Sequence, residues 1–400
     1  MRGGPLRVGV IGTSWWADLE HLPGLQALED VEVAALCGRD PGRLAALAGK
    51  YRIPATFTDW QEMIARAALD VVVIATPNAL HHSQALTALD AGLHVVCEKP
   101  LSTTLSGAVE MAERGERAGR QTLTFFTHRA VAAAGHVKRL VDEGFLGRPL
   151  HVSASYFTAS HLQDRPLAWK MRRAEAGTGV LGDIGSHLVD LVRWWLGDLS
   201  RVAGQWQTPH RERSGGVADA DEDCSFLAQM ACGAQAVFQA SKLVAGRANH
   251  QRIELHGDLG SLVYEAEPGS DPTWEGRVLA GRRGRHGLEV LPPPPDLAAG
   301  LDGPDPQANR NEAYRRLTDP FLAAIRREGQ MAPNARGGAS GAPGDGPATG
   351  GRSGARAWPD FRDGAAVQAV LDAVAASADA GRWMDVQKVP PRRDAADRTP

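Results

Sequence analysis

The chain is poor in cysteine and has no long apolar run. Its four cysteines, spread over 400 residues, form no CxxC pair, which argues against a disulfide framework. No segment approaches 18 uninterrupted apolar residues, and the first residues lack the apolar stretch of an export signal. The sequence therefore predicts reduced, buried thiols, no membrane span and a cytoplasmic location.

An excess of charge of either sign is also missing. The 44 Lys and Arg residues nearly balance the 47 Asp and Glu residues, and the net charge is -3. Without a broad basic field, the chain is not expected to bind nucleic acid or an anionic membrane. Its length and its 43% hydrophobic content predict a globular protein of two or three domains that binds a small neutral or anionic ligand.

The first third of the chain does contain a regular alternation of apolar runs and helix-like segments. Continuous apolar strands separated by helices are typical of a parallel sheet covered on both faces. We therefore predict an α/β, doubly wound N-terminal domain over residues 1–125. The predicted strands occupy residues 6–11, 31–37, 69–75, 93–97 and 122–126, and the predicted helices occupy residues 18–28, 41–50, 79–91 and 104–118.

The pattern changes after residue 125. Short strands that follow one another without helices between them predict an α+β second domain, residues 126–390, with a mostly antiparallel open sheet. A hairpin signal at 257–260 joins two of these strands. Residues 267–308 are predicted to be irregular and residues 391–400 to be a mobile tail. The predicted strands are 150–157, 201–207, 225–230, 234–240, 252–256 and 261–265, and the predicted helices are 130–143, 309–327 and 360–379.

One long segment of the second domain has almost no apolar side chains. Residues 332–357 contain none larger than alanine. Such a segment cannot bury enough surface to offset the entropy lost on ordering, so we predict that it is a disordered insert.

The turn after the first strand carries part of the dinucleotide-binding fingerprint GxGxxG/A. The small residues of this motif let the backbone come close to a pyrophosphate. Gly12 and Ala17 match this pattern, and Ser14 departs from it. At the first βα turn of an alternating domain, the motif predicts a Rossmann fold. The predicted cofactor-binding residues are Gly12, Thr13, Ser14, Trp15, Trp16 and Ala17, although packing under the turn is the favoured role of the two tryptophans.

The end of the second strand bears on the choice of cofactor. An acid about 20 residues after the fingerprint would favour NAD, but the chain reads Cys37, Gly38, Arg39, Asp40. Gly38 leaves room for a 2′-phosphate, and Arg39 offers a fork of donors to bind it. NADP(H) is therefore favoured over NAD(H). The alternative is that Arg39 extends into water and that Asp40 caps the next helix ahead of Pro41.

The strongest apolar run ends in Thr76, Pro77 and Asn78. Pro77 forces an extended turn, and Asn78 is suited to cap the following helix, whose start would then point at the cofactor. The two histidines that follow, His81 and His82, have no cysteine or carboxylate nearby at ligand spacing, so no metal site is predicted.

Two further stretches carry candidate catalytic groups. Glu98 and Lys99 follow a predicted strand, and a lysine at the carboxyl end of a parallel strand is well sited to touch a ligand. Asp183 and His187 are four residues apart, so they share a helix face on which the carboxylate can hold one imidazole nitrogen. A neutral histidine suits removal of a hydroxyl proton, and an ammonium group lowers the cost of an alkoxide. The alternatives are an ordinary solvated Glu-Lys pair and a core histidine.

Taken together, these motifs resemble the glucose-fructose oxidoreductase, inositol dehydrogenase and MocA (Gfo/Idh/MocA) family. They are the degenerate fingerprint, TPN with His81 three residues on, EKP ending at Pro100, and GxxxDxGxHxxD from Gly179 to Asp190, with FxxAIRxEG and AGRWMDV nearer the end. The resemblance implies Lys99, Asp183 and His187 as the catalytic set beside the nicotinamide, with Arg129 in the substrate pocket. It implies further cofactor contacts from His81, Glu98, Trp169 and Lys170, and a homodimer or homotetramer formed through the second sheet.

The sequence thus predicts an NADP(H)-preferring oxidoreductase that acts on a secondary alcohol of a sugar, cyclitol or related polyol, or reduces the matching ketone. His187 would move the proton, Asp183 would orient it, and Lys99 would steady the oxyanion. Two alternatives within the same family stay open. One is a redox-silent regulator that binds a dinucleotide and a partner protein, and the other is a glycosidase that uses NAD as a transient oxidant.

Overall fold

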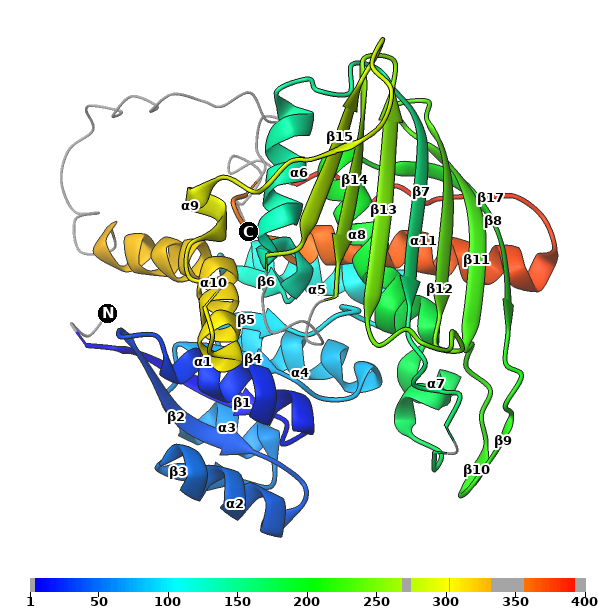
Figure 1. Cartoon of the computed structure of the whole chain (residues 1–400). Coiled ribbons are helices and arrows are strands. Elements are labelled where there is room, and N and C mark those ends of the chain that lie inside the picture. The colour runs from blue at the N-terminus through cyan, green and yellow to red at the C-terminus, as the bar shows by residue number, and fades with distance from the viewer. Residues whose placement is uncertain (1–3, 164, 268–274, 302, 332–355, 393–400) are drawn as a thin grey trace.

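The computed structural model describes residues 4–163, 165–267, 275–301, 303–331 and 356–392. Its first sheet has six parallel strands in the order β3-β2-β1-β4-β5-β6 (Figure 1). From β1 the strands follow one another toward β3 at one edge, and from β4 they follow one another toward β6 at the other edge. The strand order therefore reverses between β1 and β4, which is where α/β sheets bind ligands. The strands are β1 (Leu6–Ile11), β2 (Val31–Cys37), β3 (Ala55–Phe57), β4 (Val71–Ile74), β5 (His94–Cys97) and β6 (Thr122–Thr124).

Helices cover both faces of this sheet, as its continuous apolar strands predict. All four residues of β4 are at most 2% exposed, because one face packs on a cluster that includes Leu22 and Leu44 and the other on a cluster that includes Ala85 and Met111. The helical elements are η1 (Ala17–His21, a π-helical turn), α1 (Leu22–Gln26), α2 (Pro41–Tyr51), α3 (Trp60–Arg66), α4 (Asn78–Asp90) and α5 (Leu105–Arg117).

The second sheet has nine strands in the order β16-β15-β14-β13-β7-β12-β11-β8-β17. Only β7 and β12 pair in parallel, and the predicted hairpin at 257–260 joins the antiparallel strands β13 and β14. A separate ribbon pairs β9 (Glu212–Arg213) with β10 (Gly216–Val217). The strands of the sheet are β7 (Pro149–Phe157), β8 (Leu199–Gln207), β11 (Asp223–Met230), β12 (Gln235–Ser241), β13 (His250–Gly257), β14 (Gly260–Ala266), β15 (Arg277–Arg282), β16 (Glu289–Val290) and β17 (Met384–Asp385).

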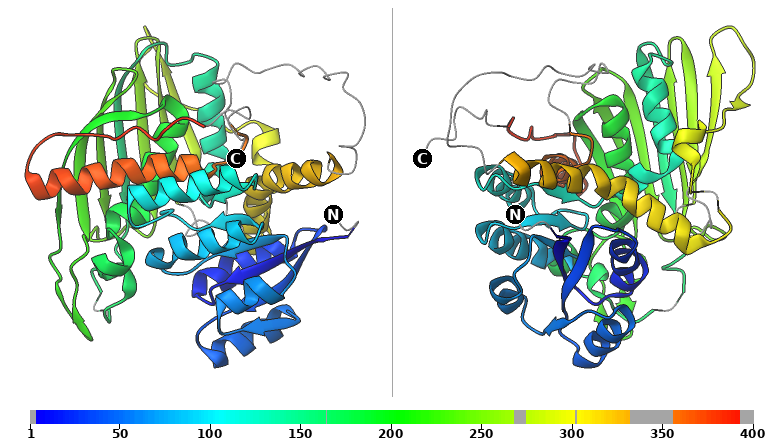
Figure 2. Two further views of the ribbon diagram at one scale, coloured as in Figure 1. Left: turned by 180° about the vertical axis from the view of Figure 1, so that it is seen from behind. Right: turned by 90° about the vertical axis from the view of Figure 1, so that its left-hand side faces the viewer.

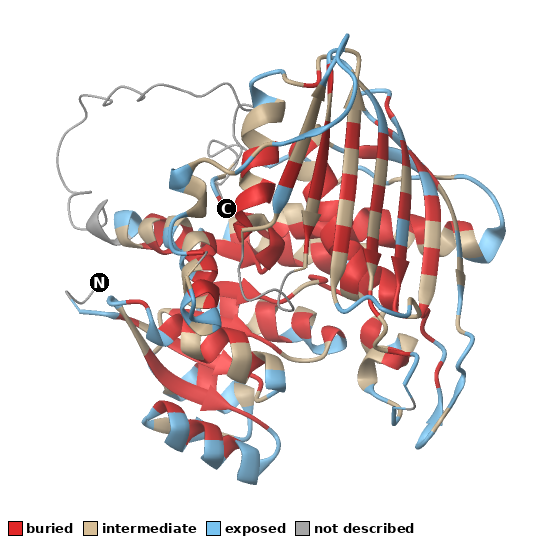
Figure 3. Ribbon diagram, in the orientation of Figure 1, coloured by how far each residue is buried: buried red, intermediate tan, exposed pale blue. Residues whose placement is uncertain are grey.

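Helices lie on one face of the second sheet and leave its other face open (Figures 1 and 2). The covering helices are α6 (Ala132–Asp142), α8 (Ser186–Leu196) and α11 (Phe361–Ala380). Buried and exposed residues alternate along the strands, as expected for a sheet with one face on the core (Figure 3). The remaining short elements are η2 (Thr127–Ala130), η3 (Trp169–Met171), α7 (Arg173–Ala176), η4 (Leu181–Gly185, π-helical) and α9 (Pro295–Ala298).

Helix α10 (Pro306–Met331) returns from the second sheet to the first. Its Tyr314 and Phe321 are fully buried in the same cluster as Leu22 of α1. Residues from both sides of position 125 therefore build the core on one face of the first sheet. None of the described helices is both long enough and apolar enough to span a bilayer.

Three sequence expectations need correction or fall outside the described residues. The segment 267–308 is not irregular where it is described, because it contributes β15, β16 and α9; β15 is short and only Val278 in it is fully buried, which leaves a weak pattern. Cys232 is exposed, so the prediction of four buried thiols is wrong for it. The predicted insert at 332–357 and tail at 391–400 lie almost entirely outside the described residues.

Candidate functional site

A cavity of about 930 Å³ lies where the carboxyl ends of β1, β4 and β5 meet the second sheet. The loops after these three strands form one wall of the cavity. The opposite wall comes from the end of β7, from η4 and the start of α8, and from the residues just after β12. Among the predicted site residues, those that line it are Ser14, Trp15, Trp16, Thr76, Pro77, Asn78, Glu98, Lys99, Trp169, Lys170, Asp183 and His187. Those that do not are Gly12, Thr13, Ala17, Gly38, Arg39, His81 and Arg129.

The first βα turn is tight and depends on Gly12. Its φ is +126°, and a Cβ on it would lie 2.3 Å from the carbonyl oxygen of Ala75, so only glycine is tolerated. Ser14, the departure from the fingerprint, accepts a hydrogen bond from the Ala17 N–H at 3.3 Å while facing the cavity. The Ser14 hydroxyl hydrogen is thus still available to an anionic group of a bound dinucleotide.

The end of β2 differs in detail from the sequence expectation. A Cβ on Gly38 would lie 2.4 Å from the Thr13 methyl group, so the absent side chain makes room for Thr13. Arg39 is exposed, and the Arg43 guanidinium donates to the backbone carbonyl of Thr13. Asp40 caps α2 by accepting from two backbone N–H groups, as the alternative interpretation predicted, and it is therefore not placed as a ribose acceptor.

The polar groups after β4 hold loops together. Asn78 does not cap α4; Pro77 occupies the N-cap position, and the Asn78 amide donates to the carbonyl of Ala176 at 2.9 Å. This bond ties the first sheet to the segment before η4. His81 is fully buried and bonds to the carbonyls of Thr76 (2.9 Å) and Pro100 (3.0 Å), so it joins the loops after β4 and β5 instead of facing the cavity.

Glu98 is bound by Trp16, which directly precedes η1, and by His21, the last residue of η1. Its Oε1 accepts from Trp16 Nε1 at 2.6 Å and lies 2.9 Å from His21 Nε2. Burial alone would raise the pKa of Glu98, but the contacts with His21, the charge of Lys99 and the hydrogen bond from Trp16 together outweigh burial, and the pKa is lowered. Glu98 is therefore ionised and fixed beside Lys99. No cluster of three or more His, Cys, Asp or Glu residues in the described part of the chain is placed to hold a metal.

Three ammonium groups surround the single carboxylate of Asp183. Lys170 Nζ lies 2.7 Å from Oδ1, Lys242 Nζ lies 2.8 Å from Oδ2, and Lys99 Nζ lies 3.4 Å from Oδ1 and donates to the Asp183 backbone carbonyl at 2.5 Å. Burial would raise the pKa of Asp183, yet the three lysines hold it well below its usual range. Burial lowers the pKa of Lys99, and Asp183 opposes that effect only in part. The site combines an ionised carboxylate with an excess of ammonium groups.

His187 does not have the partner that its spacing predicts. No hydrogen bond or ion pair joins it to Asp183 among the described residues, and its Nδ1 is buried without a hydrogen-bond partner there. Its ring stacks instead on His128, with centroids 3.7 Å apart and planes at 24°. Burial, followed by the electrostatic influence of His128 and Lys99, holds the pKa of His187 well below its usual range. The imidazole is therefore neutral near pH 7 and able to accept a proton.

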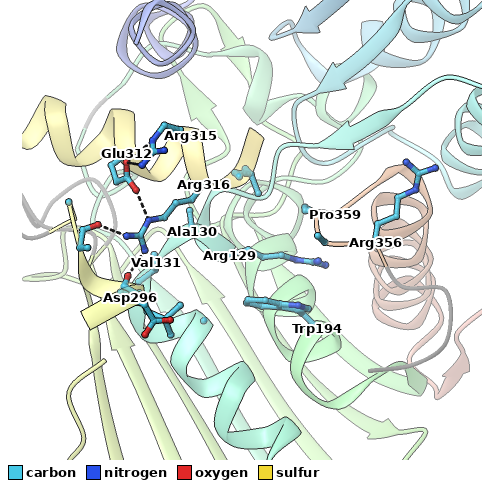
Figure 4. Close-up of a pocket in the computed structure, with 17 residues that line it drawn as sticks. Arg129, Ala130, Val131, Trp194, Asp296, Glu312, Arg315, Arg316, Arg356 and Pro359 are labelled. Carbon is cyan, nitrogen blue, oxygen red and sulfur yellow. Dashed lines mark hydrogen bonds and ion pairs between the residues drawn. The ribbon is translucent and has the colours of Figure 1, made fainter. Parts of the chain in front are cut away.

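Arg129 lies in a different cavity from the one expected. It lines a second cavity of about 780 Å³, together with residues of α8, α9 and α10 (Figure 4). Its guanidinium donates twice to Asp190, at 2.6 and 2.9 Å, and lies over the ring of Trp194. Because Asp190 is only 1% exposed, this pair is a buried ion pair in the wall between the two cavities.

Several residues that line the first cavity were not identified from the sequence. His128, Tyr156, Lys242 and Asn249 all line it. Lys242 directly follows β12 and therefore carries the same signal, a lysine at a strand end, that identified Lys99. The Tyr156 hydroxyl donates to Asn249 at 2.5 Å, but no local pattern marks either residue.

Comparison with known proteins gives matches over both sheets. A family model described as an oxidoreductase family with an NAD-binding Rossmann fold matches residues 6–126, and a GFO/IDH/MocA C-terminal domain model matches residues 135–263. Levoglucosan dehydrogenase of Pseudarthrobacter phenanthrenivorans is 31% identical over 57% of this chain and 63% of its own length, so the chain spans less than two thirds of that relative. D-xylose 1-dehydrogenase (NADP(+)) 2 of Haloferax volcanii is 30% identical over 79% of this chain and 88% of its own length.

The fold is also similar to solved structures. The structure of levoglucosan dehydrogenase in complex with NADH and L-sorbose aligns with a TM-score of 0.80 and 25% sequence identity, covering 96% of this chain and 100% of that one. One of these relatives is named for NADP and the other was solved with NADH, so NAD(P) is the class of cofactor that the comparisons support.

Proposed function

The chain belongs to the Gfo/Idh/MocA family of NAD-binding oxidoreductases, and on this premise we propose that it is an NAD(P)-dependent dehydrogenase or reductase. Its substrate is a secondary alcohol, or the matching ketone, of a sugar, cyclitol or related polyol. The observation that carries the proposal is the meeting of Lys99, Asp183 and His187 in one cavity with the loops that follow β1 and β4.

Each residue of the site has a separate role in the proposed hydride transfer. A bound nicotinamide would supply or accept the hydride, and Ser14, Trp16 and the turn at 76–78 would hold the dinucleotide. His187 takes the hydroxyl proton in the oxidative direction, a role worth about 10²- to 10⁴-fold in rate. Lys99 stabilises the developing alkoxide. Asp183 stays ionised and keeps the ammonium groups of Lys99, Lys170 and Lys242 in place.

The proposal extends to a preference for NADP(H). Arg39 is exposed just after β2, with Arg43 nearby at Thr13. Asp40, the nearest acid, is already used in capping α2. Two guanidinium groups and no free carboxylate at this point favour a 2′-phosphate over a 2′-hydroxyl.

A homodimer or homotetramer formed through the open face of the second sheet is part of the same proposal. The face without helices is the candidate partner surface, because the helices of the chain leave it open. Light scattering coupled to size-exclusion chromatography measures the assembly. A cytoplasmic location, and the lack of a nucleic-acid partner, remain predictions.

The test begins with fluorescence titration of the purified chain with NADPH and NADH, since Trp15 and Trp16 line the cavity. A panel of sugars and polyols with each oxidised cofactor, and of the matching ketones with each reduced one, then follows absorbance at the wavelength of the reduced nicotinamide. Cofactor binding with turnover supports the proposal. Cofactor binding without turnover on any panel member, together with capture of a protein partner, would favour the redox-silent regulator. Hydrolysis of a glycoside with no net change in the cofactor would favour the glycosidase.

A further inference from the structure

The side chain that orients His187 is not the one expected from the sequence. Asp183 bonds to lysines, and the Nδ1 of His187 has no hydrogen-bond partner among the described residues. Of the three described aromatic rings around the imidazole, His128 is the nearest, with centroids 3.7 Å apart, while the centroids of Phe126 and Tyr156 lie 6.3 and 6.4 Å away. A stacked ring restricts rotation about the side-chain bonds, so His128 limits the directions in which His187 can point.

His128 is itself fixed by a buried chain of hydrogen bonds. The Tyr264 hydroxyl donates to Gln251 Oε1 at 3.1 Å, which turns the Gln251 amide nitrogen toward His128 Nδ1, 2.6 Å away. Nδ1 then accepts, and the hydrogen of the neutral ring is carried by Nε2. Gln251 and Tyr264 are at most 1% exposed, so the second sheet supports the ring rigidly.

Charged groups close to the stacked rings disfavour a proton on either ring. Lys99 and Lys170 face the rings from the loop after β5 and from η3, Asp183 faces them from η4, and Tyr156 faces them from the sheet. A proton on His128 would face the lysine ammonium groups in a buried site and would also lack an acceptor at Nδ1, because the Gln251 amide nitrogen already points there. Two neutral rings can stack closely, whereas two charged rings would repel each other.

We propose that His128 is the positioning residue for His187 and that Gln251 fixes His128 in the neutral tautomer that allows the close stack. This inference rests on the proposed function, in which His187 moves the substrate proton. Since misplacement of a catalytic group by about 1 Å costs about 10²-fold in rate, loss of the His128 ring is expected to lower kcat by about that factor.

The test compares His128→Ala, which removes the ring, with His128→Phe, which keeps a stacking ring but loses the bond to Gln251. We expect kcat to fall about 100-fold in His128→Ala and about 5- to 10-fold in His128→Phe, with the KM for sugar and the Kd for cofactor within about threefold. Gln251→Leu should resemble His128→Phe. Added imidazole should partly restore the kcat of His128→Ala by filling the vacated space.

A matched control is His136→Phe, because His136 is equally buried, on α6, and lines neither cavity. It should leave kcat unchanged. An unchanged kcat in His128→Ala, or a raised KM with unchanged kcat, overturns the proposal; the second result would make His128 a substrate contact. If His128→Ala does not fold, the kcat of His128→Phe and Gln251→Leu decides: wild-type values in both overturn it.

A readout that does not need turnover separates this inference from the proposed function. Diethyl pyrocarbonate modifies exposed neutral histidines, and mass spectrometry locates the modified residue. His187, which is only 6% exposed, should be modified slowly in the wild type and faster in His128→Ala, since removal of a closely packed ring opens space beside the imidazole. Equal modification rates contradict the positioning role even if no substrate is found. Faster modification in a protein without turnover keeps the positioning role and removes the proposed function.

Discussion

Two cavities of similar size share a wall in this protein, and they differ in how their charged side chains are paired. Consecutive residues of η2 divide between them, since His128 lines the first and Arg129 the second; on α8, His187 lines the first and Trp194 the second. In the first, three ammonium groups share one carboxylate and a histidine nitrogen has no hydrogen-bond partner among the described residues.

In the second cavity each arginine of the lining has a carboxylate partner. Arg129 pairs with Asp190, Arg315 and Arg316 pair with Glu312, and Arg356 pairs with Asp360. The volumes, about 930 and 780 Å³, do not separate the two cavities. The two cavities differ in whether their polar groups are fully paired within the described part of the protein. The first cavity retains polar groups that are not fully paired there, and a substrate needs such groups in order to bind. The comparison therefore supports the catalytic role proposed for the first cavity and indicates a structural role for the charges of the second.

The largest expected effect is the loss of the proposed catalytic groups in the first cavity. His187→Ala and Lys99→Met should each lower kcat by about 10²- to 10⁴-fold while the cofactor Kd changes less than about threefold, because both groups act on the substrate oxygen. Steady-state kinetics and fluorescence titration measure the two quantities. His82→Ala is the control, since His82 pairs with Glu110 and lines neither cavity. Unchanged turnover in both site variants would contradict the catalytic roles proposed for His187 and Lys99.

The complementary change in the second cavity should act on stability instead. Arg129→Met leaves the buried carboxylate of Asp190 without its partner and should lower the free energy of unfolding by about 3–5 kcal/mol, with kcat of the folded enzyme within about fivefold of wild type. Urea denaturation measures the loss. The double variant Arg129→Met/Asp190→Leu should recover most of it. A 100-fold fall in kcat/KM at unchanged stability would contradict the structural role of the second cavity and indicate that Arg129 contacts the substrate.

Acid should destabilise the fold through buried neutral histidines in β5 and η2. Burial, followed by Arg120, lowers the pKa of His94 from 6.5 to about 4, and its Nδ1 accepts from the Gln121 N–H. Burial, followed by Lys99, lowers the pKa of His128 to about 3. Between pH 6.5 and these values the unfolded chain binds protons that the folded chain does not, so stability falls as the pH falls through that window.

Above pH 6.5 neither state binds these protons, and this contribution to the slope disappears. Urea unfolding at pH 6.5 and 4.5 tests the sign. The His94→Gln variant should lose about 2 kcal/mol less than the wild type between these two pH values, at about 1.4 kcal/mol per pH unit for one group. An identical loss in the variant would show that His94 does not contribute.

The smallest effect is expected at the cofactor's ribose end, outside both cavities. Arg39→Ser should weaken NADPH binding by about five- to tenfold, since one exposed charge-assisted contact is worth about 1 kcal/mol, and should leave NADH binding unchanged. Arg117→Ser on α5 is the control for a lost surface charge. Tighter binding of NADH than of NADPH by the wild type would contradict the NADP(H) preference.

Much of the first sheet could be predicted because its signals are local. The runs at 6–11 and 31–37 are continuous apolar segments of strand length, and the structure contains β1 and β2 with those bounds. The position of Lys99 followed from a general rule, since the ends of parallel strands meet at one edge of a sheet. The strands of the second sheet and the hairpin at 257–260 were recognisable for the same reason. Strand β15, by contrast, has few buried residues and little pattern to detect.

The sequence by itself determined the two-sheet architecture, the fingerprint turn and the segments that meet at the cavity, because backbone periodicity and strand ends are properties of neighbouring residues. Only the tertiary structure decided the partners within the site. Asp183 and His187 share a helical spacing, yet Asp183 binds lysines from η3 and from the loops after β5 and β12, and His187 stacks on a residue of η2. Arg129 likewise turns to Asp190. A buried charge takes whichever partner satisfies it at the lowest desolvation cost, and folding alone brings these distant partners together.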